Sequence, residues 1–329
     1  MKILVTGATG YLGKVLVPIL HNKGYGIRIL VRESSDISAF SGLNNINVFH
    51  GDVTRKDSLD GIEKDIQYVY HLAVLGHYGV VEHDQDYFDV NETGSVNLLE
   101  HFVGSEVKKI LYATTSGALG PIAHKTVTED DFTPPVTPYG MSKHTAELSI
   151  REFAEKHGIP YVMVRFTHVY GPGEMRDLYR IIKMMKKGIF PQVGLRPNLF
   201  PAVYLDDALN GLMLAMEKGR IGQTYIISDE TSHDLRTIRR LVRKHLGIHN
   251  RLYPVFPKYP MLGMFTVLDW ISDKTGIKFP ASRKNIQFIT AERSFSIEKA
   301  KKELGYRPMV GLDEGLRKTV EYYLQENLI

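Results

Sequence analysis

The first thirteen residues, MKILVTGATGYLG, constrain the fold more than any other stretch. The apolar, β-branched residues 3–6 predict a buried strand, and apolar residues at helical spacing predict a helix over 11–20. Between them, Gly7, Gly10 and Gly13 are spaced as GxxGxxG. Glycine spacing alone is also compatible with an ordinary turn, but a strand before it and a helix after it are typical of a pyrophosphate site.

Each glycine has its own expected role in such a turn. Gly7 permits the sharp turn, Gly10 lets the backbone approach the phosphates, and Gly13 lets the helix pack against the strand. The helix N-terminus then offers free N–H groups and the positive end of its dipole to an anion. The cofactor-binding residues predicted at this turn are Gly7, Thr9, Gly10, Tyr11 and Leu12.

Composition excludes several classes of function. The chain has no cysteine, so disulfides, thiolate catalysis and Cys-ligated metals are ruled out. Its net charge of +4 is small for 329 residues, and the cluster Lys183, Lys186 and Lys187 is typical of a solvated helix face. We therefore expect no nucleic-acid partner. With a strand predicted near Lys2 and no long apolar stretch, we expect no signal peptide, no membrane span and a cytoplasmic location.

The end of the second predicted strand, residues 27–31, bears on cofactor choice. In a dinucleotide fold this end lies beside the adenosine ribose, where an acid binds the 2′-hydroxyl and an arginine suits a 2′-phosphate. Val31 ends the strand and Arg32 and Glu33 follow it. We favour Arg32 facing a phosphate, hence NADP; the alternative places Glu33 on the ribose, hence NAD.

The next two strands are predicted to add residues on the adenine side of the cofactor. Residues 47–50 form a short strand followed by Asp52 and Val53. Asp52 is expected either to accept from the adenine amino group or to cap a helix near Lys56. Residues 67–71 form the fourth strand. Small apolar residues follow at the carboxyl edge, where ligands bind in open α/β sheets: Leu72, Ala73 and Val74.

Further strands are predicted over 109–113, 161–166, 201–205 and 224–227, with helices over 88–103, 139–157, 178–187, 207–217, 235–246, 297–304 and 312–325. Asp206 is the expected cap of the helix over 207–217. Strands alternating with helices predict an α/β, Rossmann-type, doubly wound parallel sheet. We expect residues 1–174 with 198–230 to form this domain, and 175–197 with 231–329 a smaller substrate-binding lobe.

The irregular segment 76–87 contains His77 and His83. No second pair of ligands has convincing spacing, so we expect no metal and favour substrate-pocket lining. In the helix over 88–103, Asn91 is a candidate anchor for backbone near the site.

Tyr139 and Lys143 lie four apart on one predicted helix and share a face. A nearby ammonium lowers the pKa of a phenol, which makes the pair usable in proton transfer. Lys143 has a second possible role on the cofactor ribose. Thr115, after the fifth strand, would orient the substrate oxygen, with Ser116 as the alternative donor.

Taken in order, these motifs resemble the extended short-chain dehydrogenases/reductases, also called the NAD-dependent epimerase/dehydratase family. The resemblance covers nearly the whole length: TGATGYLG, GDVT, HLA, YGMSK, RFTHVYGPG and FSIEKAKKELGYRP are similar to its motifs. It implies a tightly held nicotinamide cofactor and the catalytic triad Thr115, Tyr139 and Lys143. It also implies cofactor contacts by Tyr139, Lys143, Phe166 and Val169, and frequent homodimers through the helices over 88–103 and 139–156.

Within that family, His168 and Val31 depart from residues common in nucleotide-sugar enzymes. Arg32 and the C-terminal motif look more like the dihydroflavonol-reductase and 3β-hydroxysteroid-dehydrogenase branch. Residues 252–271 (LYPVFPKYPMLGMFTVLDWI) are too apolar for a typical surface and too proline-broken for one core helix. They are expected to form a lid over an apolar substrate, to contact a membrane surface, or to pack within the lobe.

These features predict an NADP-preferring reductase or dehydrogenase that exchanges hydride with a carbonyl or secondary alcohol. One alternative is a nucleotide-sugar epimerase or dehydratase without net cofactor use. Another is a cofactor-sensing regulator, which is disfavoured because the chain keeps both Tyr139 and Lys143.

Overall fold

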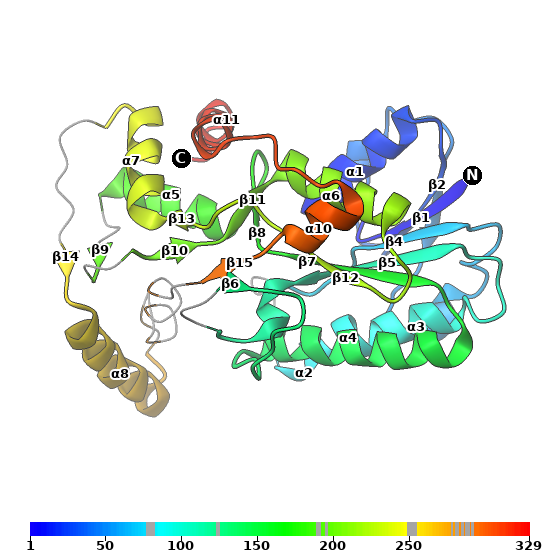
Figure 1. Cartoon of the computed structure of the whole chain (residues 1–329), viewed down its shortest axis with the longest axis horizontal. Coiled ribbons are helices and arrows are strands. Elements are labelled where there is room, and N and C mark those ends of the chain that lie inside the picture. Colours follow the sequence, from blue (N-terminus) through cyan, green and yellow to red (C-terminus); the bar gives the residue numbers. More distant parts are fainter. Residues whose placement is uncertain are drawn as a thin grey trace.

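The computed structural model describes residues 1–76, 83–122, 126–188, 192–194, 197–248, 255–277 and 293–329, with the single residues 279, 283, 286 and 290. Its centre is a seven-stranded parallel sheet in the order β12-β7-β5-β4-β1-β2-β3 (Figure 1). The strands are β1 (Lys2–Thr6), β2 (Gly26–Val31), β3 (Ile46–His50), β4 (Tyr68–His71), β5 (Lys109–Thr115), β7 (Tyr161–Phe166) and β12 (Thr224–Ile227). The Rossmann-type α/β fold expected from the sequence is confirmed.

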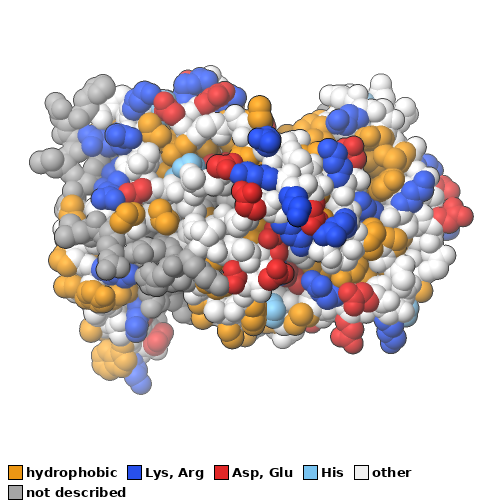
Figure 2. Space-filling model, in the orientation of Figure 1, with side chains coloured by type: hydrophobic (Ala, Val, Ile, Leu, Met, Phe, Trp, Pro, Cys, Tyr) orange, Lys and Arg blue, Asp and Glu red, His pale blue; other side chains and the backbone are white. Residues whose placement is uncertain are grey.

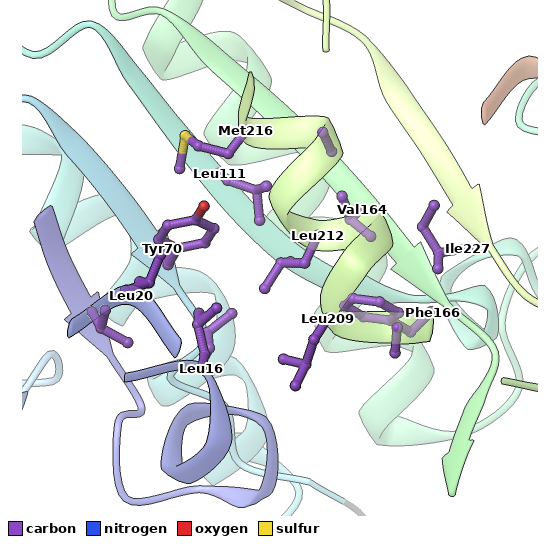
Figure 3. Close-up of a cluster of buried hydrophobic side chains, with 14 of the residues drawn as sticks. Leu16, Leu20, Tyr70, Leu111, Val164, Phe166, Leu209, Leu212, Met216 and Ile227 are labelled. Atoms are coloured by element: carbon purple, nitrogen blue, oxygen red, sulfur yellow. The ribbon is translucent and has the colours of Figure 1, made fainter. Parts of the chain in front are cut away.

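Helices cover both faces of the sheet (Figure 1). One layer holds α1 (Tyr11–Asn22), α6 (Leu205–Lys218) and α10 (Glu298–Leu304); the other holds α2 (Gln85–Phe88), α3 (Gly94–Glu100) and α4 (Pro138–His157). Figure 3 shows Leu16 and Leu20 of α1 and Leu209, Leu212 and Met216 of α6 beside side chains of the central strands. On the other face, residues of α3 and α4 pack against β1, β4 and β5. Burial of both faces accounts for the nearly continuous apolar strands.

The remaining elements lie beyond the carboxyl edge or beside the sheet. A third core joins α5 (Asp177–Lys187), α7 (Leu235–His245) and α11 (Leu312–Gln325). Short strand pairs connect the rest: β8 (His168–Tyr170) with β11 (Ala202–Tyr204), β10 (Leu199–Phe200) with β13 (His233–Asp234), β9 (Gln192–Val193) with β14 (Val255–Phe256), and β6 (Thr126–Val127) with β15 (Ser294–Phe295).

The helix expected over 88–103 is not regular. A π-helical turn, Asp89–Thr93, separates α2 from α3, and α3 ends at Glu100. Asn91 is fully buried within this turn. A π-turn inserts one residue into the helical repeat, which the spacing of apolar residues does not reveal.

The strand expected over 201–205 is shorter in the structure, where it is β11 (Ala202–Tyr204). Pro201 has no N–H to donate and separates β10 from β11, and Leu205 already belongs to α6. The expectation that Asp206 caps α6 is also wrong, because the N-cap position is Tyr204 and Asp206 lies in the first turn. There its charge still suits the positive end of the helix dipole.

Most of the apolar stretch expected over 252–271 forms one helix, α8 (Lys258–Thr275); residues 252–254 lie outside the described residues. Pro257 is its N-cap and Pro260 lies in the first turn, where a missing N–H costs no helical hydrogen bond. In the described part of the chain, no helix combines the length and apolar character needed to cross a membrane.

Candidate active site

A cleft of about 800 Å³ runs along the carboxyl ends of the sheet strands. The structure brings together in its lining every site residue expected from the sequence. These are Gly7, Thr9, Gly10, Tyr11, Leu12, Arg32, Asp52, Val53, Leu72, Ala73, Val74, Thr115, Tyr139, Lys143, Phe166 and Val169.

The glycine turn at one end of the cleft leaves no room for side chains. Gly7 has φ +66°, and a Cβ there would lie 2.6 Å from the backbone N of Ala73. A Cβ on Gly13 would lie 2.3 Å from the carbonyl oxygen of Gly7 and 2.5 Å from that of Ala8. Gly7 thus permits the turn and Gly13 permits α1 to meet β1, as expected.

The start of α1 has the properties of an anion site. Gly10 is its N-cap and supplies no side-chain hydrogen bond, so the first N–H groups of the helix remain available to a ligand. The Tyr11 hydroxyl is buried and has no hydrogen-bond partner among the described residues. The turn and the helix end together fit a dinucleotide pyrophosphate.

At the end of β2, Arg32 and Glu33 have different surroundings. Val31, Arg32 and Ser35 line the cleft, whereas Glu33 does not. The Glu33 carboxylate instead lies 3.4 Å from Nδ1 of His50.

Asp52 lines the cleft but does not cap the next helix. Its Oδ1 accepts hydrogen bonds from the backbone N–H of Thr54 at 2.9 Å and from the Thr54 hydroxyl at 2.8 Å. The short 3₁₀ helix Lys56–Leu59 has Arg55 as its N-cap. The neighbouring carbonyl of Val53 accepts from the Asn97 amide at 2.9 Å.

Hydrogen bonds hold the backbone after β4 in place. The Ala73 N–H donates to Thr6 Oγ1 at 3.1 Å. Asn91 accepts from the N–H of Leu75 at 2.9 Å and donates to the carbonyl of Leu75 at 3.1 Å and to Ser142 Oγ at 3.0 Å. The expectation that Asn91 anchors backbone near the site is confirmed by these contacts.

Tyr139 begins α4 and lies at the other end of the cleft beside Thr115. Burial raises the pKa of Tyr139 to about 12, while the Arg176 cation and a hydrogen bond with Thr115 act to lower it. The lowered pKa expected from the sequence is therefore not found in the protein alone. Desolvation outweighs the nearby charge.

Lys143, one turn later on α4, is 1% exposed. Its Nζ donates to the Tyr112 hydroxyl at 2.5 Å and to the carbonyl of Ala113 at 3.0 Å. Burial lowers the pKa of Lys143 to about 7. The ammonium therefore lies between Tyr112 and the carboxyl end of β5, at the cleft wall.

Sequence reasoning missed several residues of the site. Tyr112 lies in the buried strand β5, where an aromatic residue looks like ordinary core. Arg176 and Arg293 also line the cleft, and no periodic pattern of the sequence marks them. His168 also lines the cleft; its Nε2 lies 3.8 Å from Asp177, and burial lowers its pKa.

Within the described ranges, no group of three or more His, Asp or Glu side chains is arranged to hold a metal ion. His77 lies outside the described residues, so its predicted place in a pocket wall is not described. His83 is exposed at the start of the segment that leads into α2.

The model of the NAD-dependent epimerase/dehydratase family matches residues 3–228. The chain belongs to this family. It therefore belongs to a group of enzymes, as the resemblance implied.

Relatives within the family carry out different reactions. The chain is 26% identical to the decarboxylating sterol-4-alpha-carboxylate 3-dehydrogenase of Schizosaccharomyces pombe, over 98% of this chain and 97% of that one. It is 25% identical to a UDP-glucose 4-epimerase of Vibrio cholerae, over 99% and 96% of the two chains. Sterol-dehydrogenase and 3β-hydroxysteroid-dehydrogenase relatives support the predicted branch.

Solved structures show the same fold. The UDP-glucuronic acid 4-epimerase of Bacillus cereus, solved in complex with NAD, superposes with a TM-score of 0.78 over 99% of both chains, at 24% identity. The present chain combines a cleft that begins at a glycine turn with the partly buried Tyr139 and the buried Lys143 at its other end. That arrangement suits redox chemistry on an oxygen-bearing carbon.

Proposed function

We propose that this enzyme is an NADP-dependent dehydrogenase or reductase that interconverts a carbonyl and a secondary alcohol in a small, partly apolar substrate. One observation carries the proposal: Thr115, Tyr139 and Lys143 line the same cleft as the glycine turn. In this proposal the turn binds the cofactor phosphates, and the segments 175–197 and 231–329, apart from α10 on the sheet, form the lobe over the substrate.

The residues at the catalytic end have distinct roles in this proposal. A bound nicotinamide cofactor supplies or accepts the hydride. With a pKa of about 12, the Tyr139 hydroxyl is protonated at neutral pH and donates its proton to a carbonyl oxygen during reduction. Thr115 orients that oxygen, and Lys143 binds a ribose hydroxyl from the cleft wall.

NADP is the proposed cofactor because of the residues at the end of β2. Arg32 and Ser35 line the cleft, and both can donate hydrogen bonds to a 2′-phosphate. Glu33 does not line the cleft, and its carboxylate lies 3.4 Å from Nδ1 of His50. Solved relatives such as the epimerase of Bacillus cereus hold NAD, so the preference for NADP is proposed for this chain from its own residues.

The test is the affinity of the protein for NADPH and NADH, measured by cofactor fluorescence, with Arg32→Ala and Glu33→Gln as the paired variants. Loss of one charge-assisted contact should weaken NADPH binding about tenfold. NADH binding should stay within about twofold in Arg32→Ala, and Glu33→Gln should behave like the parent protein.

The opposite pattern would support the alternative placement of Glu33 on the ribose. In that case the parent protein would prefer NADH, and Glu33→Gln would be the variant that loses affinity.

A second candidate is a nucleotide-sugar epimerase or dehydratase, favoured by the likeness to the epimerase of Vibrio cholerae. A dehydratase needs an additional acid and base near the substrate carbon. The residues next to Thr115 in the chain, Thr114, Ser116 and Gly117, supply no carboxylate, and the carboxylates of the cleft nearest this end come from other segments, among them Asp86 and Asp177. Net NADPH formation is therefore the observation that separates the two candidates.

We also propose a homodimer formed through α3 and α4, which pack side by side on one face of the sheet. Met141 and Leu148 of α4 are 44% and 52% exposed and supply apolar surface for such a contact. A cytoplasmic location stays a prediction.

A further inference from the structure

Helix α8 presents apolar side chains to solvent. Met261 is its buried residue, whereas Tyr259 is 82% exposed, Met264 51%, Val267 56% and Trp270 62%. Met264, Val267 and Trp270 are spaced by three and lie on one side of the helix. We call these three residues the α8 stripe.

The apolar surface continues beyond both ends of the helix. Val255 and Phe256 of β14, just before α8, are 54% and 42% exposed, and Ile277 after it is 55% exposed. Figure 2 shows hydrophobic side chains over α8 at the lower left of the molecule. Exposed apolar side chains gathered in one part of a surface are typical of an interaction site.

The sequence left three possibilities for this segment: packing within the lobe, a lid over an apolar substrate, or contact with a membrane surface. The structure disfavours the first two. Among the described residues, α8 packs through one side, where Met261, Leu262 and Phe265 meet Val193 and Ile286, while its other side is exposed, unlike that of a core helix. It is also not a lid in this structure, because none of the described residues that line the cleft belongs to α8. Contact with a lipid surface is the third possibility and the one that is developed below.

Basic residues outnumber acidic ones in the segments that contain α5, α7 and α8. The described residues of 175–197 and 231–290 include 13 Lys and Arg residues but only 4 Asp and Glu residues, and α11, which packs against α7, adds Asp313, Glu314 and Glu321. The helices α5, α7 and α8 lie at the opposite end of the molecule from β1 and β2 (Figure 1). Exposed basic side chains include Arg180, Lys183 and Lys187 on α5 and Arg240 on α7.

We call α5 and α7 the basic helices. A chain of contacts leads from α7 to the strand that precedes α8. Arg239 of α7 donates to Gln192 of β9 at 3.0 Å, and β9 pairs with β14, which leads directly into α8. Lys274 lies in the last turn of α8, and its spacing places it on the side of the α8 stripe. By the same spacing, Asp269 and Asp273 lie on other sides of the helix.

We propose that α8 docks this end of the molecule on an anionic lipid surface, with the α8 stripe in the interface and the basic helices near the headgroups. Apolar burial and attraction to anionic lipid act together in such binding. A second copy of the chain is a poorer occupant, because a symmetric contact would bring two basic ends together.

Trp270 makes the proposal directly measurable, because it is the single tryptophan of the chain. The intact protein is mixed with phosphatidylcholine vesicles that contain or lack phosphatidylglycerol, and tryptophan emission is recorded. We expect a blue shift, quenching by brominated acyl chains, and co-sedimentation with the anionic vesicles. Added salt should weaken all three.

The paired variants are Met264→Glu/Val267→Glu and, as control, Ile221→Glu, which changes a residue that is 51% exposed far from α8 in sequence. The double variant should lose vesicle binding about tenfold or more, and the control should stay within about twofold of the parent. Far-UV circular dichroism verifies that both variants are folded.

Three results would overturn the proposal. One is unshifted emission with anionic vesicles, and another is equal binding to neutral vesicles. The third is a blue shift that depends on protein concentration without vesicles, which would instead identify a second copy on α8.

Discussion

Lys143 combines a functional position with almost complete burial, and burial changes its charge. Its pKa falls from the ordinary 10.5 to about 7, because an ammonium loses its hydration inside the protein. The nearby Glu147 opposes this change. Near neutral pH, therefore, Lys143 exchanges between a charged and a neutral form.

This shift predicts a pH-dependent stability. Between about pH 7 and 10 the unfolded chain holds the Lys143 proton more tightly than the folded chain, so unfolding free energy rises with pH over that range. Lys143→Met removes this contribution. The unfolding free energy of the parent minus that of Lys143→Met should rise by about 1–3 kcal/mol from pH 6.5 to pH 9.5. Urea denaturation of both proteins provides the measurement, and a constant difference would contradict the buried titration.

Among single residues, the sequence predicted those whose role depends on the strand or helix next to them in the chain. Gly7, Gly10 and Gly13 are recognisable because a strand and a helix flank them within a few residues. Thr115 and Tyr139 are recognisable because a strand ends and a helix begins there. Arg176 and Tyr112 have no such local signal, since tertiary packing alone brings Arg176 near Tyr139 and Tyr112 against Lys143.

Among the elements, α1 is the one whose placement decides where a cofactor can bind. Its contact with β1 depends on Gly13, because a Cβ there would overlap two backbone carbonyl oxygens, of Gly7 and of Ala8. Backbone atoms cannot rotate away as a flexible side chain can.

Gly13→Ala should therefore lower the unfolding free energy by about 1–3 kcal/mol and weaken NADPH binding by displacing the start of α1. Gly42→Ala is the matched control, since a Cβ on Gly42 meets nothing within 4 Å and its φ is not positive. Thermal or urea unfolding of both variants gives the comparison. Equal stability of the two would show that α1 does not need Gly13.

The sequence predicted helices and strands well where the apolar residues follow one regular spacing. It failed where that spacing is interrupted. The apolar strands and the helices α1 and α4 follow clear patterns. The π-turn around Asn91 breaks the helical repeat, and Pro201 divides an apolar run into two short strands. In α8, the prolines lie at the start, where a helix accepts them, and the apolar residues face solvent rather than a core.

For the whole molecule, the two proposed contact surfaces lie in different places along its long axis. One helical layer includes α4 with its exposed apolar residues, and the opposite end of the chain's long axis from β1 and β2 carries α8 and the basic helices (Figure 1). The proposed dimer contact and the proposed lipid contact therefore use different surfaces.

Leu148→Glu should shift the proposed homodimer toward monomer, because the new carboxylate would be buried without a partner in the contact between α4 helices. Size-exclusion chromatography with light scattering measures the mass. Met309→Glu, which changes a 79% exposed residue outside α4, is the control and should leave the mass unchanged. A parent protein that is monomeric at micromolar concentration would contradict the dimer.

The proposed function is net redox chemistry in which Tyr139 transfers the proton. Its most direct test incubates the protein with NADP⁺ and a panel of secondary alcohols, including 3-hydroxysteroids, and separately with UDP-glucose, while absorbance at 340 nm and product are measured together. We expect one NADPH to form for each ketone, and we expect the rate in Tyr139→Phe to fall by about a hundredfold or more. Conversion of UDP-glucose without net NADPH formation, or full turnover by Tyr139→Phe, would contradict it.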